Sequence, residues 1–230
     1  MKIDSEVLSI GFEGMHGVGK TTQITLLQEY LGTENIPYLL LRGDGGRTGT
    51  GDHPGNPHSD WWQAYNQALF EDQNVDDIDY WDIGNQRLVR EIKATKKRLF
   101  PHSLEKQGHS KGVILLDRSI VSRVTFLRRA GRITNPLDDA CSTLYDPRVN
   151  ISDIAPDVIF EFIAPKETLQ DRIPIDDKHQ FKVTMINDVY DTFYTSKDYL
   201  PEDLRKRVHV IDGTKPIPLI HQEILTRLHE

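Results

Sequence analysis

The sequence predicts an α/β fold in which a five-stranded parallel sheet lies between two layers of helices, three layers in all. Five short apolar runs recur along the chain, and the segments between them are long enough for helical crossovers. The runs are apolar at consecutive positions, a pattern typical of strands buried on both faces. The expected strands are 7–13, 38–42, 112–117, 158–163 and 208–212.

A glycine-rich segment follows the first expected strand. Gly14 to Thr21 reads G-M-H-G-V-G-K-T and precedes a stretch, 22–31, whose apolar residues recur at helical spacing. Strand, glycine loop and helix together are the setting of a phosphate-binding P-loop, in which backbone N–H groups and a helix N-terminus surround a polyphosphate. We expect nucleotide contacts from Gly14, Met15, His16, Gly17, Val18, Gly19, Lys20, Thr21 and Thr22. A purely structural glycine turn is the alternative.

Two side chains of this loop carry the expected chemistry. Lys20 would reach the β- and γ-phosphates of a bound nucleotide, and the Thr21 hydroxyl would bind Mg²⁺. ATP and Mg²⁺ are therefore the expected cofactors, and the fold class is that of a P-loop NTPase.

Composition limits the remaining choices. The 230 residues carry a formal net charge of -7, which disfavours nucleic acid as a partner. The single cysteine, Cys141, excludes an intrachain disulfide and suits a cytoplasmic protein. No apolar run approaches the 18 residues of a membrane-spanning helix, so no membrane association is expected.

The whole chain, 1–230, is expected to form one domain that contains an insertion and a lid. The segment 43–59 is rich in Gly, Asp, His and Pro, which indicates a long loop. We assign 43–100 as an insertion that binds the acceptor, with a helical stretch over 82–99. Within it, Trp81 could stack on a flat ring and Arg87 could face an anion. Core packing and a solvated helix face are the respective alternatives.

The ends of the other strands supply further candidates, because ligands of parallel sheets bind beyond the carboxyl ends of the strands. After the third strand, Asp117 could hold Mg²⁺ or orient the acceptor, while Arg118 could grip a phosphate or carboxylate and Ser122 could face the site. A surface ion pair is the alternative for Asp117 and Arg118.

Arg42 and Asp44 follow the second strand. Arg42 is a candidate for binding the acceptor. The Asp44 carboxylate could accept a proton from an acceptor hydroxyl, or it could form a turn among the neighbouring glycines.

A short lid is expected at about 171–182, after the fourth strand and its helix. Phosphate transfer needs positive charge over the transferring group. Arg172 is the candidate for that role, with Lys178 second, and ordinary surface charge is the alternative.

These motifs together resemble the thymidylate kinases. Residues 12–23, F-E-G-M-H-G-V-G-K-T-T-Q, resemble that family's F-E-G-x-D-G-x-G-K-[ST]-T-Q. Three later segments resemble its T-R-E-P-G-G, its D-R-[YF]-x-x-S and its P-D-x-x-[IL] followed by L-x-R-[IL]; they are 41–46, 117–122, and 156–160 with 169–173. In this chain His16 stands in place of the family's P-loop aspartate, and Gly17 leaves the loop without a catalytic arginine.

The resemblance implies a nucleoside monophosphate kinase-like fold and phosphate transfer from ATP with Mg²⁺. It also implies that Arg118, Arg42 and Arg87 face the acceptor, and that a homodimer is possible. The related deoxynucleoside kinases use an acidic base near the end of the second strand, which would be Asp44 here. The expected acceptor is a nucleoside monophosphate of the thymidylate type or a nucleoside. One alternative is that the acceptor is a non-nucleoside metabolite. The other is that the protein is a regulatory P-loop NTPase switch.

Overall fold

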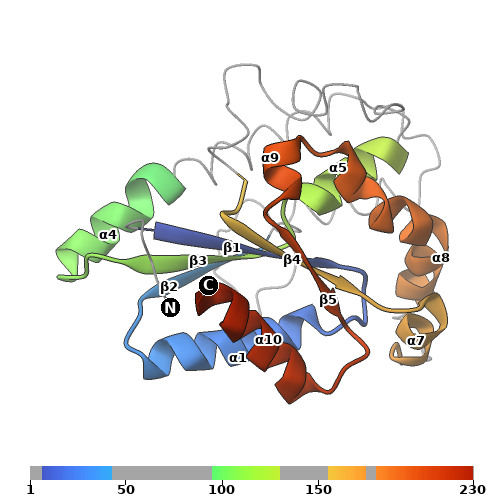
Figure 1. The fold of residues 1–230 in the computed structure, drawn as a ribbon, viewed down its shortest axis with the longest axis horizontal. Helices are drawn as coiled ribbons and strands as arrows, with labels where there is room; N and C mark the ends of the chain where they lie inside the picture. Colours follow the sequence, from blue (N-terminus) through green and yellow to red (C-terminus); the bar gives the residue numbers. More distant parts are fainter. Residues whose placement is uncertain (1–6, 43–94, 130–154, 175–179, 230) are drawn as a thin grey trace.

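The structure is a computed structural model that describes residues 7–42, 95–129, 155–174 and 180–229. Its core is a five-stranded sheet, all of whose pairings are parallel (Figure 1). The order across the sheet is β2-β3-β1-β4-β5. The five expected strands are confirmed as β1 (Val7–Gly14), β2 (Tyr38–Arg42), β3 (Gly112–Asp117), β4 (Val158–Ile163) and β5 (Val208–Asp212).

The centre of the sheet is buried on both faces. β1 lies between β3 and β4, and its residues Ile10 and Phe12 are fully buried. The Phe12 ring lies 5.9 Å from that of Phe160 and 6.2 Å from that of Phe162. Burial on both faces is the physical reason for the consecutive apolar runs in the sequence.

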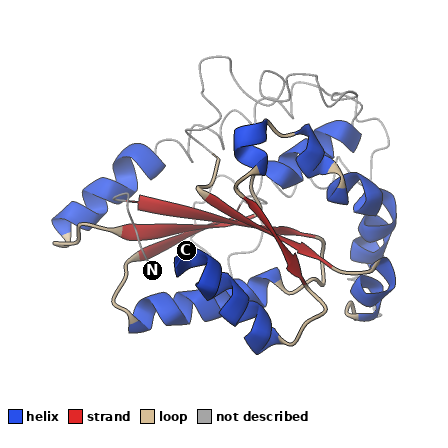
Figure 2. Cartoon of the chain, in the orientation of Figure 1, coloured by secondary structure: helices blue, strands red, loops and turns tan. Residues whose placement is uncertain are grey.

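Helices cover the two faces of the sheet and give the predicted three layers (Figure 2). On one side lie α1 (Lys20–Thr33) and α10 (Ile217–His229). On the other lie α5 (Ile120–Arg129), α8 (Gln180–Tyr194) and α9 (Glu202–Arg205), with the 3₁₀ turn η3 (Ser196–Tyr199) between the last two. The short helix α7 (Lys166–Asp171) follows β4. Within the described ranges no helix is both long and apolar enough to span a membrane.

One helix boundary differs from expectation. The stretch predicted to end at residue 99 continues, because the π-helical turn η1 (Thr95–Leu99) leads directly into α4 (Phe100–Lys106). Pro101 lies at the start of α4, so the π-helical turn gives way to the α-helix beside the residue that lacks an N–H. Phe100 and Leu104 pack over Gly112, so α4 covers the start of β3. The earlier part of that stretch, 82–94, lies outside the described residues.

Candidate phosphate-binding site

The glycine loop connects β1 to α1 as the sequence predicts. Gly14 has φ +144°, and a Cβ there would lie 2.8 Å from Val18 Cγ1 and 2.9 Å from the Phe162 carbonyl oxygen. Gly19, the residue before α1, has φ +100°. Both conformations disfavour residues with a side chain, so the motif's glycines are required by the backbone path.

The Lys20 side chain is hydrogen-bonded to the backbone of the glycine loop. Lys20 is the first residue of α1 and is buried, and its Nζ donates hydrogen bonds to the carbonyl oxygens of Gly14 (2.8 Å) and Met15 (3.1 Å). Thr21 and Thr22 follow in the first turn of the helix and are exposed, while His16 is half-buried. The ammonium group therefore lies where the backbone of the loop begins to turn.

The N-terminus of α1 has the features of an anion site. No side chain among the described residues caps it, and the first turn holds no acidic residue. The first N–H groups of a helix have no partner within the helix, and the helix dipole favours negative charge there. The exposed loop residues Gly17 and Gly19 leave the backbone accessible.

The loop is packed against the ends of two other segments. A Cβ on Gly213, which follows β5, would lie 2.8 Å from Val18 Cγ2. Arg172 donates from Nη1 to the carbonyl oxygens of Gly213 (2.9 Å) and Gly17 (3.4 Å). The predicted lid arginine thus lies against the P-loop. Of the predicted lid, residues 175–179 with Lys178 lie outside the described residues, and Gln180 already begins α8.

Arg118 at the end of β3 has an unusual backbone conformation. Its φ is +70°, its N–H donates to the Phe12 carbonyl oxygen at 2.9 Å, and it is 6% exposed. Its Nη1 donates to Ser122 Oγ at 3.3 Å. Asp117 is the register partner of both Phe12 and Arg42. The structure therefore brings Asp117, Arg118 and Ser122 next to the strand that leads into the loop.

Glu13 is a buried charged residue that the sequence reasoning missed. It lies in β1 immediately before the loop and is fully buried. Its Oε1 accepts from Ser119 N (2.6 Å), Ser119 Oγ (2.8 Å) and Val121 N (3.1 Å), and its Oε2 accepts from Ser122 Oγ. A charged residue inside an apolar strand was the signal that could have found it.

A second buried glutamate, Glu161, is the register partner of Glu13 on β4. Its Oε2 lies 3.2 Å from Lys197 Nζ in an ion pair, while its Oε1 has no hydrogen bond within the described part of the chain. Burial raises the pKa of Glu161 to about 6, although the Lys197 charge opposes that shift and the Glu13 charge adds to it. The sequence reasoning missed this residue as well.

Other predicted site residues cannot be placed. Asp44, Trp81 and Arg87 lie outside the described residues. The backbone of Arg42 ends β2 beside Asp117, but its side chain is not among those described.

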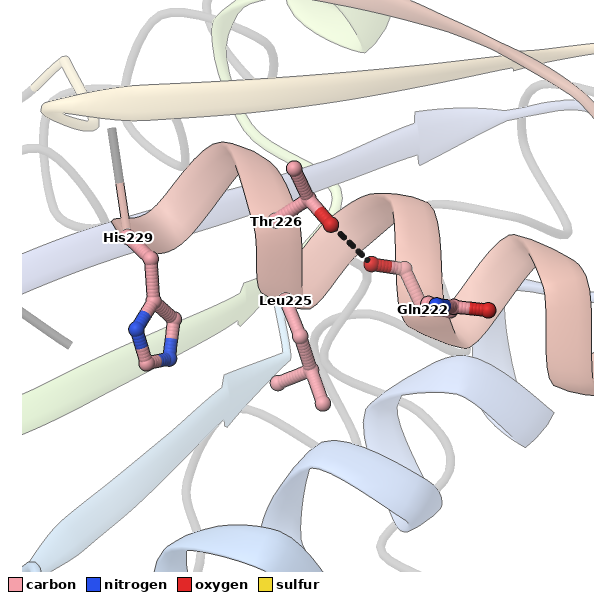
Figure 3. A pocket seen from close by; sticks show the side chains of 4 residues that line it. All are labelled: Gln222, Leu225, Thr226 and His229. Carbon is pink, nitrogen blue, oxygen red and sulfur yellow. Dashed lines mark hydrogen bonds between the residues drawn. The ribbon is translucent and has the colours of Figure 1, made fainter.

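A shallow cavity lies elsewhere, along α10. Its lining comes from Gln222, Leu225, Thr226 and His229, and the Thr226 hydroxyl donates to the Gln222 carbonyl oxygen (Figure 3). His229 Nε2 lies 3.3 Å from the hydroxyl of Tyr30 on α1. Tyr30 is ten residues beyond Lys20, about 15 Å along the helix axis. This cavity is therefore separate from the phosphate loop.

No three histidine, cysteine or acidic residues in the described ranges gather as a metal site. Mg²⁺ in nucleotide sites is typically held by one or two protein groups together with water and phosphate oxygens. Thr21 and Asp117 would be those groups here.

A strand–glycine loop–helix unit at the centre of a parallel sheet of this order defines the class as a P-loop NTPase fold of the nucleoside monophosphate kinase-like type. A solved thymidylate kinase from Ehrlichia chaffeensis is similar over 97% of this chain and 99% of its own, with a TM-score of 0.50 and 22% identity. At that identity the likeness shows the fold alone.

Curated relatives match a shorter stretch. The thymidylate kinase of Symbiobacterium thermophilum is 51% identical over 37 residues, 16% of this chain and 17% of that protein. That of Rickettsia typhi is 54% identical over 37 residues, 16% of this chain and 18% of that protein. The match thus spans less than a fifth of these relatives. No known protein-family profile matches the chain. The resemblance to thymidylate kinases is confirmed by these similarities.

Proposed function

We propose that this protein transfers the γ-phosphate of ATP, with Mg²⁺, to a nucleoside monophosphate of the thymidylate type. The observation that supports the proposal most is the P-loop itself, with Lys20 buried at its base and Arg118 at the end of the adjacent strand. The thymidylate kinases that the chain resembles direct the choice of acceptor.

The donor phosphates fit the loop because of its chemistry. The N–H groups at the start of α1 offer hydrogen-bond donors, and the first turn of that helix contains no acidic residue. Lys20 would exchange its two carbonyl partners for phosphate oxygens. The Thr21 hydroxyl and the Asp117 carboxylate would hold Mg²⁺, which when bound neutralises phosphate charge.

Arginines would handle the acceptor. Arg118, with its guanidinium held by Ser122, would bind the acceptor phosphate, and Arg42 and Arg87 would assist. Trp81 would stack on the base. An oxygen of the acceptor phosphate would then attack the γ-phosphorus, and ADP would leave. Arg172, at the rim of the loop, would stabilise the charge on the transferring group.

If the acceptor is a nucleoside instead, a base must take the proton of its hydroxyl, and Asp44 is the candidate. An acceptor that already carries a phosphate needs no such base. Asp44→Asn separates the two cases: it would reduce transfer to a nucleoside strongly and transfer to a monophosphate little.

The test is ADP release from ATP and Mg²⁺ with a panel of nucleosides, nucleoside monophosphates and non-nucleoside metabolites, with mass spectrometry of the products. We expect the strongest activity with thymidine monophosphate and a diphosphate product. Slow hydrolysis with no phosphorylated acceptor would instead support a regulatory NTPase. Light scattering of the same sample tests the predicted homodimer.

A further inference from the structure

Glu13 makes four hydrogen bonds to a segment far from it in sequence. Its carboxylate accepts hydrogen bonds from N–H and O–H groups of Ser119, Val121 and Ser122, all at the junction between β3 and α5. It is fully buried, so water does not compete for these donors. Four protein donors therefore satisfy one buried carboxylate.

Two of those donors belong to the start of α5. Ser119 N and Val121 N lie at the beginning of the helix, where backbone N–H groups lack partners within it. The carboxylate of Glu13 therefore caps α5 from a neighbouring strand, and its charge is favourable at the positive end of the helix dipole.

The same contacts hold Arg118 from both sides. Its own N–H is bonded to the Phe12 carbonyl oxygen, and the next N–H, that of Ser119, is bonded to Glu13. The left-handed φ of +70° at Arg118 is unfavourable for a non-glycine residue and persists only where the surroundings impose it. Consecutive residues of β1 thus hold consecutive N–H groups across this bend.

The guanidinium is connected to Glu13 as well. Arg118 Nη1 donates to Ser122 Oγ, and Ser122 Oγ donates to Glu13 Oε2. The carboxylate therefore sets the direction of the hydroxyl, which leaves the oxygen lone pairs toward the arginine.

We infer that Glu13 is a positioning residue for Arg118: it fixes both the backbone bend and the guanidinium, and so orients the arginine that would bind the acceptor phosphate. The kinetic consequence rests on the proposed function. The orientation of Arg118 by Glu13 does not rest on the proposed function, so an experiment can contradict either claim without contradicting the other.

The test compares Glu13→Gln with Glu161→Gln in the full chain. Glu161 is a matched control because it is equally buried and is the register partner of Glu13, while its described ionic partner is Lys197 of η3 rather than a residue of the β3–α5 junction. In Glu13→Gln the amide brings a second donor toward Ser122 Oγ, in competition with Arg118. With thymidine monophosphate as the probe, we expect its KM to rise about 10- to 100-fold, the effect of a small misplacement of a binding group. The KM for ATP should change less than about twofold.

A kinetic result can also contradict the inference. If Glu13→Gln leaves the KM for thymidine monophosphate unchanged, or raises the KM for ATP equally, Glu13 does not act through Arg118. If Glu13→Gln does not fold, Glu13→Asp replaces it, because it keeps the charge but shortens the reach to α5 by one methylene.

A second readout does not depend on activity. With ¹⁵N-labelled arginine, the Nε–H signal of Arg118 is assigned by its loss in Arg118→Lys, and its exchange with water is measured. We expect the signal to be protected in the wild type and in Glu161→Gln, and to shift and exchange faster in Glu13→Gln. An unchanged signal in Glu13→Gln overturns the inference. Absence of wild-type turnover with an altered Glu13→Gln signal overturns only the proposed function.

Discussion

The buried ammonium group of Lys20 has a structural role and an expected chemical role. A buried ammonium requires hydrogen-bond acceptors, and the Gly14 and Met15 carbonyl oxygens supply them. The same contacts keep the positive charge inside the turn of the loop, where phosphate oxygens would bind.

Lys20→Ala is expected to lower turnover by about 10³-fold, because it removes a charge from the transferring phosphates. The fold should persist, since the loop path is set by its glycines. Steady-state kinetics and circular dichroism measure the two effects. Lys106→Ala, an exposed lysine on α4, is the control and should be neutral. Near-normal activity in a folded Lys20→Ala protein would contradict the assignment.

Gly213 supports the loop from the end of β5. Gly213→Ala would place a Cβ 2.8 Å from Val18 Cγ2 and 3.0 Å from the Ile163 carbonyl oxygen. We expect a loss of about 1–3 kcal/mol in the free energy of unfolding, measured in urea, because the tightly packed surroundings must move. Gly32→Ala in α1 is the matched control, because no atom of the described residues lies within 4 Å of the added Cβ. It should stabilise the protein by about 0.5–1 kcal/mol. Equal effects from the two substitutions would argue against tight packing at Gly213.

Among the secondary-structure elements, β4 and η3 are joined by a buried ion pair. Glu161 of β4 is fully buried, and its Oε2 lies 3.2 Å from Lys197 Nζ of η3. Burial raises the pKa of Glu161 more than Lys197 lowers it, which gives a native value of about 6. The pair therefore holds η3 against the sheet, but an ionised Glu161 is costly there.

A defined pH dependence follows. The ordinary pKa of Glu161 is 4.5 and the native one about 6, so between these values the unfolded chain releases the proton and the native protein retains it. The free energy of unfolding should therefore fall as pH rises through this window, by about 2 kcal/mol for Glu161 alone. Urea titrations of the wild type and Glu161→Gln at pH 4.5, 6 and 7 isolate that component by difference.

Removing the cation tests the cause. Lys197→Met should raise the pKa of Glu161 further and move the loss of stability to higher pH. A constant difference between the wild type and Glu161→Gln from pH 4.5 to 7 would show that the carboxyl does not titrate in this window.

At the level of the whole molecule, the candidate site depends on the sheet as a body. The loop follows β1, Arg118 follows β3, Gly213 follows β5, and Arg172 follows α7. These residues lie together because β3, β1, β4 and β5 are neighbours in one parallel sheet. A ligand that contacts this edge therefore stabilises the native fold as a unit.

ATP with Mg²⁺ should raise the melting temperature in a concentration-dependent way. At 100 times its Kd a ligand of the native state adds about 2.7 kcal/mol, which for a chain of this size corresponds to about 5–10 °C. Differential scanning calorimetry measures the shift, and Lys20→Ala should abolish most of it. A shift of the same size in Lys20→Ala would mean that the nucleotide binds elsewhere.

The central strands β1, β3 and β4 were predictable because each is buried on both faces, so its apolar run is visible without knowledge of its neighbours. The edge strands β2 and β5 are less buried, but their residues are still mostly apolar. Four of the five have the expected bounds, and β1 differs by one residue. The helix boundary at residue 99 was wrong, because the helical path continues through Pro101, where the π-helical turn gives way to α4. The P-loop was predictable because its glycines, Lys20 and Thr21 are contiguous. The roles assigned to Asp44, Trp81 and Arg87 stay predictions.

Local order along the chain was enough for the fold class and the phosphate loop, since both depend on spacing within a few residues. Glu13 and Glu161 depended on folding instead. They are 148 positions apart in sequence, yet they are register partners on adjacent strands. The parallel pairing of β1 with β3 brings Glu13 to the start of α5, and the packing of η3 against the helices brings Lys197 to Glu161. A carboxylate takes its role from the donors around it, and those donors are assembled by tertiary structure.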